Sequence, residues 1–227
     1  MDADDTIFDF PKCEYNAVKN TFEKYNFEFT QNLYEKYSEI NNSLWKKFEI
    51  GQITRQELRI QRFEQTCNFF GICNDTETLK LLANAYVDEL AKQDILIDGA
   101  YEAVKKISSL CEIYIITNGL STVQRGRFGK SSITKLLKDI FISDELEVQK
   151  PHKEFFDIVL SKINENDKSK ILVVGDSLTS DMQGGKNAGL KTCIYDPKDK
   201  ISMPHNLCDY KVTALENICD IIKEKET

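Results

Sequence analysis

Short apolar runs alternate with helical segments over the second half of the chain, and this alternation limits the fold more than any other feature. The four runs are rich in β-branched and aromatic residues: Ile113–Ile116, Ile140–Ile142, Ile171–Val174 and Thr192–Tyr195. Apolar strands that alternate with helices are typical of a parallel sheet covered by helices on both faces. The pattern therefore predicts an α/β fold with a doubly wound parallel sheet.

The segment from residue 12 to residue 93 has a different pattern, with helical periodicity and almost no strand signal. Apolar residues recur at three- and four-residue steps from Leu33 to Phe48, which places them on one helical face. Thr54 followed by Glu57 is typical of a capping box that begins another helix. We expect about four amphipathic helices here, packed as a small bundle.

Charge and composition narrow the class of partner. The 227 residues carry a formal net charge of −7 and no basic cluster, which disfavours duplex nucleic acid and anionic membranes as partners. Arg125 and Arg127 are expected on a solvated helix face.

No apolar run approaches the roughly 20 residues that span a bilayer, and no signal peptide follows Met1. The seven scattered cysteines include no Cys-x-x-Cys pair, so we expect free thiols in a reducing cytoplasm.

Polar residues stand at the chain start and at the ends of predicted strands, where open parallel sheets bind their ligands. Asp181 comes five residues after Asp176, and Lys150 precedes a proline between the second and third runs. The four polar segments are Asp2-Ala3-Asp4-Asp5-Thr6, Thr117-Asn118-Gly119, Lys150-Pro151 and Gly175-Asp176-Ser177. We expect their side chains to converge at one edge of the sheet.

Several of these residues suit the hydrolysis of a phosphate monoester. Such an ester is negatively charged and hydrolyses extremely slowly unaided, so its charge must be shielded and the leaving alkoxide must be protonated. A carboxylate nucleophile divides the reaction through an aspartyl-phosphate, and Asp2 and Asp4 can serve as nucleophile and proton donor. Asp176 supplies a further carboxylate for a hard divalent cation, which favours magnesium.

The remaining segments offer groups that bind an anion. Thr117 and the backbone amides around Asn118 and Gly119 can cradle phosphate oxygens. Lys150 adds a positive charge against both the phosphate and the crowded aspartates. The expected ligand is therefore a small-molecule phosphomonoester.

The four polar segments together resemble the four sequence motifs of the haloacid dehalogenase-like hydrolases, and the resemblance covers the whole chain. It implies that Asp2 is the nucleophile and a magnesium ligand. It implies that Asp4 is the general acid and then the base, with its main-chain carbonyl on magnesium. It further implies that Asp176 ligates the metal, and that Asp181 supports the metal site from nearby or through water.

The same resemblance assigns the phosphate site and the domains. Thr117, Asn118, Gly119 and Lys150 would bind and neutralise the phosphate, with Lys150 also counted among the catalytic residues. Residues 1–11 and 94–227 would form the catalytic core. Residues 12–93 would form a helical cap of the kind that closes over the substrate and excludes water.

Finer similarity points to one branch of the family, the bacterial pyrimidine-type 5′-nucleotidases. The segments that carry it are Leu96–Ala100, Ile115–Gly119, Val148–Pro151, Gly175–Leu178 and Gly184–Leu190. It implies uridine, deoxyuridine or thymidine monophosphate as substrates. A phosphatase for a sugar phosphate or phosphoglycolate is an alternative, as is an inert ligand-binding homologue. A dehalogenase is disfavoured, because dehalogenases of this family lack an aspartate at the place of Asp4.

The chain start departs from the family pattern. In the family, an apolar strand of about five residues leads into the first aspartate, whereas only Met1 precedes Asp2 here. We expect the first core strand to be missing, from a chain truncated at its start. Asp2 would then lie on a frayed terminus beside a charged amino group, and its preorganisation should suffer. Monomer and homodimer both remain open.

Overall fold

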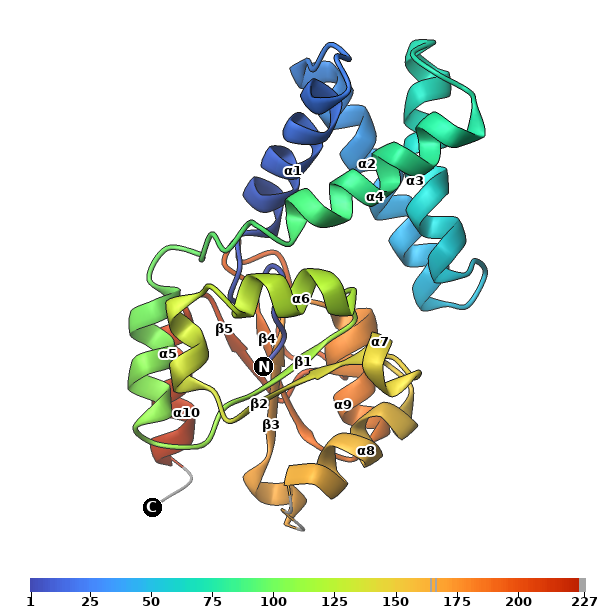
Figure 1. Ribbon diagram of the computed structural model, residues 1–227. Coiled ribbons are helices and arrows are strands. Elements are labelled where there is room, and N and C mark those ends of the chain that lie inside the picture. The colour runs from blue at the N-terminus through green and yellow to red at the C-terminus, as the bar shows by residue number, and fades with distance from the viewer. Residues whose placement is uncertain (164, 166, 225–227) are drawn as a thin grey trace. The chain divides into compact units, whose positions relative to one another are not determined.

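The structure, a computed structural model, describes residues 1–163, 165 and 167–224. The chain forms two compact units (Figure 1). One unit consists of Met1–Phe10 and Asp94–Thr227, and the other of Pro11–Gln93. Within the described residues, no helix combines the length and the apolarity that crossing a bilayer requires. The seven cysteines, all of them described, form no disulfide with one another.

The second unit is helical, as its periodicity predicts. Its helices are α1 (Phe10–Lys24), α2 (Gln31–Glu49), α3 (Arg55–Phe70) and α4 (Thr76–Leu90). The capping box at the start of α3 is confirmed: the Thr54 side chain accepts from the Glu57 backbone N–H, and the Glu57 carboxylate accepts from the Thr54 N–H at 2.7 Å. The apolar face predicted between Leu33 and Phe48 is buried.

A buried polar cluster lies inside this helical unit, which the apolar periodicity does not predict. Asn41 donates from Nδ2 to the Glu14 carboxylate at 2.6 Å, and Arg62 donates from Nη1 to Asn41 Oδ1 at 3.4 Å. Arg62 also lies over the Tyr86 ring, with 4.3 Å between the guanidinium carbon and the ring centroid. Burial raises the pKa of Glu14, while Asn41 and Arg62 lower it.

The first unit contains the strands, and every strand pair found among the described residues is parallel. They are β1 (Tyr114–Thr117), β2 (Asp139–Ile142), β3 (Leu172–Gly175), β4 (Lys191–Tyr195) and β5 (Tyr210–Val212). The first four agree closely with the four predicted runs. The sequence analysis missed β5 because a strand of three residues with a lysine at its centre gives no periodic signal.

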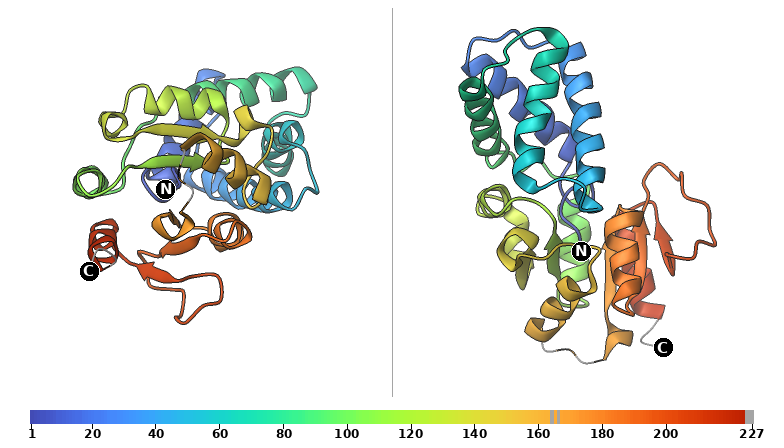
Figure 2. Two further views of the ribbon diagram at one scale, coloured as in Figure 1. Left: turned by 90° about the horizontal axis from the view of Figure 1, so that it is seen from below. Right: turned by 90° about the vertical axis from the view of Figure 1, so that its right-hand side faces the viewer.

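Helices cover both faces of these strands (Figure 2). Ile115 and Val174 pack in an apolar cluster with α5 and α10, whereas their neighbours Ile116 and Val173 pack in a second cluster with α8. Successive side chains of a strand point to opposite faces, so the two clusters lie on opposite sides of the strands.

The helices of this unit are α5 (Ala100–Ser108), α6 (Ser121–Phe128), α7 (Ser143–Leu146), α8 (Lys153–Ile163), α9 (Gln183–Asn187) and α10 (Ile218–Glu224). Four shorter helical turns accompany them: η1 (Ser132–Leu136), η2 (Lys168–Lys170), η3 (Leu178–Met182) and η4 (Leu215–Asn217).

The described strands do not form the single continuous sheet that the sequence predicts. One sheet has the order β1-β2 and the other has the order β3-β4-β5. Figure 2 shows the start of the chain between them. The Met1 amino group donates to the Tyr114 carbonyl at 2.6 Å, the Ile116 N–H donates to the Met1 carbonyl at 2.9 Å, and the Asp2 N–H donates to the Val174 carbonyl at 2.8 Å. Two residues are too few to be assigned as a strand, and among the described residues the backbone bonds of Met1 and Asp2 connect β1 with β3.

Candidate active site

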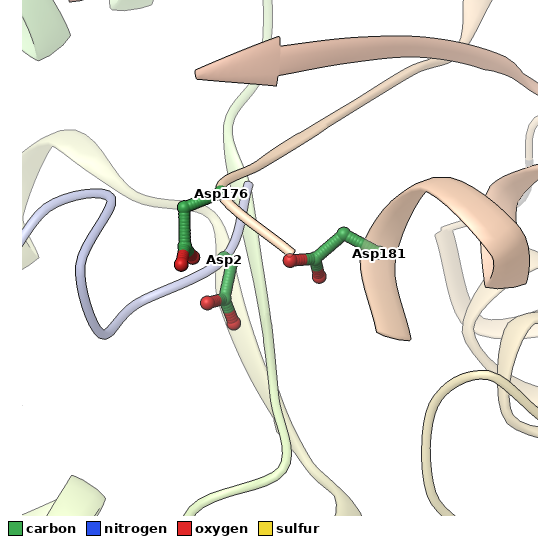
Figure 3. Close-up of side chains that lie close together, drawn as sticks. All are labelled: Asp2, Asp176 and Asp181. Atoms are coloured by element: carbon green, nitrogen blue, oxygen red, sulfur yellow. The ribbon is translucent and has the colours of Figure 1, made fainter. Parts of the chain in front are cut away.

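Three aspartates converge where the chain start meets the end of β3 (Figure 3). Asp2 follows Met1 between the two sheets, Asp176 comes directly after β3, and Asp181 lies in η3. Each offers one carboxylate oxygen, and these oxygens lie within 4.8 Å of one another. Asp2 is 8% exposed and Asp181 is 1% exposed. The strand ends therefore bring together three of the residues expected to hold a metal.

Lys150 is the cation that this cluster contains. Its Nζ donates to Asp2 Oδ1 and to Asp181 Oδ1, each at 2.6 Å, and to the Ile116 carbonyl at 2.9 Å. The side chain is fully buried among these partners. Burial opposes its charged form, but the Asp181 and Asp2 carboxylates raise the pKa of Lys150 above its usual value. Lys150 is therefore a fixed positive charge at the centre of the site.

One lysine does not balance three carboxylates. Burial, together with the negative charge of Asp181, raises the pKa of Asp2 to about 7, although Lys150 acts to lower it. Burial and the charges of Asp2 and Asp181 likewise raise the pKa of Asp176 well above its usual value. A further positive charge would favour the ionised form of both groups.

The donor set fits magnesium, the cofactor expected from the sequence. Mg²⁺ binds one or two carboxylates, keeps several waters and accepts phosphate oxygens as ligands. Asp2 and Asp176 offer carboxylate oxygens at the mutual spacing of a shared ion. The Thr6 hydroxyl donates to Asp176 Oδ1 at 3.3 Å, which orients that carboxylate. Asp181 is tied to Lys150 and, through Oδ2, to the Ser177 N–H at 3.3 Å.

The expectation that Asp2 lies on a frayed terminus is wrong for this structure. The backbone on both sides of the Asp2 side chain is bonded to neighbouring strands, through Met1 to β1 and through the Asp2 N–H to β3. Lys150 fixes the carboxylate as well. Three backbone bonds and one buried ion pair thus hold the end of the chain in place.

Asp4 is held by two residues of α6 that the sequence analysis did not assign to the site. Gln124 Nε2 donates to Asp4 Oδ2 at 2.7 Å, and Arg127 Nη1 donates to Asp4 Oδ1. The expectation that Arg127 lies on a solvated face is wrong: it is 0% exposed, and its guanidinium carbon lies 4.0 Å from the centroid of the Phe8 ring. By contrast, Arg125 is half exposed and pairs with Glu145.

The sequence did carry a signal for Arg127. Val123 and Phe128 mark the buried face of α6, and a helix places residues three or four positions apart on the same face. Arg127 follows Val123 by four positions and Gln124 by three. A charged residue on a buried helical face requires a partner, and Asp4 is that partner here.

We expect Asp4→Ala to lower the free energy of unfolding by about 3–5 kcal/mol, because it leaves the buried Arg127 guanidinium without its carboxylate. Asp4→Asn keeps an acceptor oxygen for Arg127 and should cost less. Urea unfolding of the two variants at neutral pH measures the difference. Equal stability of the wild type and Asp4→Ala would show that the ion pair does not form in solution.

Three of the residues expected around the phosphate lie at the end of β1: Thr117 is its last residue, and Asn118 and Gly119 follow it. The Thr117 hydroxyl accepts from the Gly119 N–H at 3.1 Å. The Asn118 side chain binds the backbone of Lys150 on both sides, donating to its carbonyl and accepting from its N–H, each at 2.9 Å. Asn118 therefore positions Lys150 through its side chain, which leaves only its backbone amide for an anion.

Gly175 is the residue that lets Asp181 approach the end of β3. A Cβ at position 175 would lie 2.3 Å from Asp181 Oδ2 and 2.8 Å from its Cβ. The second distance involves an atom that cannot turn away, so Asp181 itself must move. We expect Gly175→Ala to weaken magnesium binding by about 10–100-fold, as displaced supporting groups do, measured by calorimetric titration with Mg²⁺. An unchanged affinity for Mg²⁺ would show that Asp181 does not support the metal site.

Comparison with known proteins gives independent evidence for the family to which the chain belongs. The sequence profile described as haloacid dehalogenase-like hydrolase matches residues 1–195. The chain is 35% identical to the HAD-hydrolase YfnB of Bacillus subtilis, over all of this chain and 95% of that protein. The crystal structure of YfnB bound to magnesium superimposes with a TM-score of 0.90, covering 97% of this chain and 96% of that one.

Two further relatives carry the name pyrimidine 5′-nucleotidase. PynA of Streptococcus pneumoniae is 32% identical over 98% of this chain and 93% of that protein. YjjG of Escherichia coli is 33% identical over 85% of this chain and 83% of that protein. These similarities extend across both compact units of the chain.

Proposed function

The chain belongs to the haloacid dehalogenase-like hydrolases, and we propose that it is the magnesium-dependent member that hydrolyses pyrimidine nucleoside 5′-monophosphates through a phosphoryl group carried on Asp2. One observation carries the proposal. The Asp2 carboxylate is buried, fixed by Lys150 and flanked by Asp176 and Asp181, with a second carboxylate two residues further on. Within the proposal, the unit of Met1–Phe10 and Asp94–Thr227 is the catalytic core and Pro11–Gln93 is the cap.

The proposed reaction has two steps. Asp2 attacks the phosphorus atom, the bond between phosphorus and the ester oxygen breaks, and Asp4 gives a proton to the leaving alkoxide. Asp4 then removes a proton from a water molecule, which attacks the aspartyl-phosphate and releases inorganic phosphate and the free Asp2 carboxylate. Bound magnesium would supply positive charge against the phosphate oxygens. Lys150 supplies the same kind of charge from the protein and keeps the Asp2 carboxylate in place.

The contacts of Asp4 position it for these two steps. Gln124 donates to Asp4 Oδ2 at 2.7 Å and Arg127 donates to Asp4 Oδ1, so both carboxylate oxygens are held by residues of α6. These two side chains therefore orient the group that the proposal uses as acid and base.

Two findings support the substrate class. PynA and YjjG are named for pyrimidine nucleotides and each aligns with most of this chain. The segments that point to the same branch include Ile115–Gly119 and Gly175–Leu178, which border the aspartate cluster. A nucleoside 5′-monophosphate presents the dianionic monoester for which the site is suited.

A phosphate-release panel tests this proposal. We expect turnover of uridine, deoxyuridine and thymidine monophosphates with Mg²⁺, at least about tenfold above adenosine and guanosine monophosphates in kcat/KM, and none in EDTA. Tenfold discrimination corresponds to about 1.4 kcal/mol of differential binding. Preference for glucose 6-phosphate or phosphoglycolate would keep the phosphatase and overturn the substrate class. No release from any ester by a folded protein would favour an inert ligand-binding homologue.

A further inference from the structure

Gly119, in the turn between β1 and α6, lies directly against the Gln124 side chain. A Cβ built at position 119 would lie 2.3 Å from Gln124 Nε2 and 3.0 Å from both Cδ and Cγ of the same side chain. The φ angle of Gly119 is not in the left-handed region, so its backbone conformation does not by itself require glycine. Position 119 requires glycine because the Gln124 amide occupies the space that any side chain there would need.

The position of Gln124 in α6 explains this close contact. Gln124 lies in the first turn of the helix, where its N–H donates to the Leu120 carbonyl at 2.9 Å. Side chains of a helix lean toward its N-terminus, so the Gln124 amide extends back toward the turn that contains Gly119. The residue is only 1% exposed. A buried amide in this place has little room to move aside.

The Gln124 amide is held on one side by Asp4. Its Nε2 donates to Asp4 Oδ2 at 2.7 Å. Its Oε1 is buried and has no hydrogen-bond partner among the described residues. The orientation of the amide is therefore set by the bond to Asp4 and by the free space at Gly119. If a side chain filled that space, the amide would be displaced and its bond to Asp4 would be lost.

The Gly119 backbone offers a second way to accommodate a side chain, at a different cost. The Gly119 N–H donates to the Thr117 hydroxyl at 3.1 Å, and Thr117 is buried. A shift of this backbone would break that bond and leave a polar group without its partner. Rotation of the Gln124 side chain into another rotamer disturbs less of the structure. We therefore expect Gln124 to move, and Asp4 to lose a donor.

We propose that Gly119 is a positioning residue for the acid and base of the reaction: its lack of a side chain gives Gln124 the space from which it holds Asp4. The inference rests on the proposed function, in which Asp4 gives and then takes a proton. It gives Gly119 a role separate from the binding of phosphate through its backbone amide. One buried amide then couples the turn after β1 to the start of the chain.

A double-mutant cycle tests the proposal with Gly119→Ala, Gln124→Ala and the two changes combined. We expect each single variant to lower kcat/KM for uridine monophosphate by about 10–100-fold, as misplacement of a reacting group can do. The combined variant should lose no more than Gln124→Ala alone, because the new methyl group then has room and the bond to Asp4 is already absent. Losses that multiply in the combined variant would overturn the proposal.

The control for the cycle is Gln65→Ala, which makes the same change at an exposed position of α3 and should leave kcat/KM unchanged. If the phosphate-release panel shows a preference for glucose 6-phosphate, that ester replaces uridine monophosphate in the cycle. Both esters release an alkoxide, which needs a proton from Asp4. An error in the substrate class therefore does not affect the test of Gly119.

A second ester separates a loss of proton transfer from general damage to the site. The p-nitrophenolate ion is a stable leaving group, so p-nitrophenyl phosphate needs little help from a general acid. We expect Gly119→Ala to lower kcat/KM for this ester by less than about threefold, against about 10–100-fold for uridine monophosphate. Equal losses for the two esters would show that Gly119 acts on the phosphate or on the fold, and would overturn the proposal.

Thermal unfolding tests the same contact without turnover, so that a failure of the proposed function is recognised separately. Absence of hydrolysis by the wild type would overturn the proposed function. Gly119→Ala should still melt about 3 °C or more below the wild type, whereas the combined variant should melt within about 1 °C of Gln124→Ala. An equal decrease from Gly119→Ala in both backgrounds would show that Gln124 does not occupy the space at Gly119, and the inference would be wrong.

Discussion

Asp2→Asn abolishes phosphate release, with a loss of at least about 10⁴-fold in kcat, and the protein stays folded. The expectation follows from the role of Asp2 as the attacking group, since an amide cannot form the covalent intermediate and loss of a nucleophile costs up to about 10⁶-fold. The amide oxygen can still accept the bond from Lys150, which now donates to Asp2 Oδ1 at 2.6 Å. The measurement is single-turnover phosphate release, with circular dichroism as the check on folding.

Asp157→Asn is the matched control for this experiment. It makes the same chemical change on the exposed side of α8, where Asp157 pairs with Lys153 at the surface. Its activity should equal that of the wild type. If Asp2→Asn retained a tenth or more of the wild-type rate, a water molecule rather than Asp2 would be the attacking group, and the covalent mechanism would be wrong.

Lys150→Met is expected to lower both the stability and the activity of the protein, because it removes a buried positive charge from the aspartate cluster. Methionine keeps the length of the side chain but leaves the Asp2 and Asp181 carboxylates without the ammonium that lies 2.6 Å from each. Breaking a buried ion pair by removing one partner costs about 3–5 kcal/mol of unfolding free energy. We also expect a loss of about 10³-fold in kcat, in the range found when a group that stabilises transition-state charge is removed.

Magnesium should reverse part of the stability loss in Lys150→Met. A divalent cation supplies the positive charge that the variant lacks, so its gain in melting temperature from EDTA to Mg²⁺ should exceed that of the wild type. Thermal unfolding in both buffers measures the two gains. Lys153→Met, at an exposed position on α8, is the control and should behave as the wild type. Equal gains in all three proteins would mean that magnesium binds elsewhere.

The sequence was sufficient for the parts of the fold that depend on local patterns. Four strands appear where short apolar runs predict them, and α3 begins at the predicted capping box. The convergence of Asp2, Lys150, Asp176 and Asp181 could also be predicted, because the ends of parallel strands meet at one edge. The chemical roles of these residues stay predictions until the variants are measured.

The parts that the sequence did not predict depend on contacts between distant residues. The burial of Arg127 results from a pairing with Asp4 across 123 positions, which no periodicity records. The Asn118 side chain binds the Lys150 backbone across 32 positions for the same reason. The sequence does not predict where the strands divide into two sheets. That division depends on the hydrogen bonds that Met1 and Asp2 make with β1 and β3.

The most direct test of the central claim is to capture the phosphoryl group on Asp2. The chain is mixed with uridine monophosphate and Mg²⁺, quenched in acid during turnover, digested and examined by peptide mass spectrometry. The account predicts one phosphoryl group on the peptide that begins at Met1, labile to hydroxylamine and absent from Asp2→Asn. Phosphate release without this adduct, or an adduct on a different residue, would contradict it.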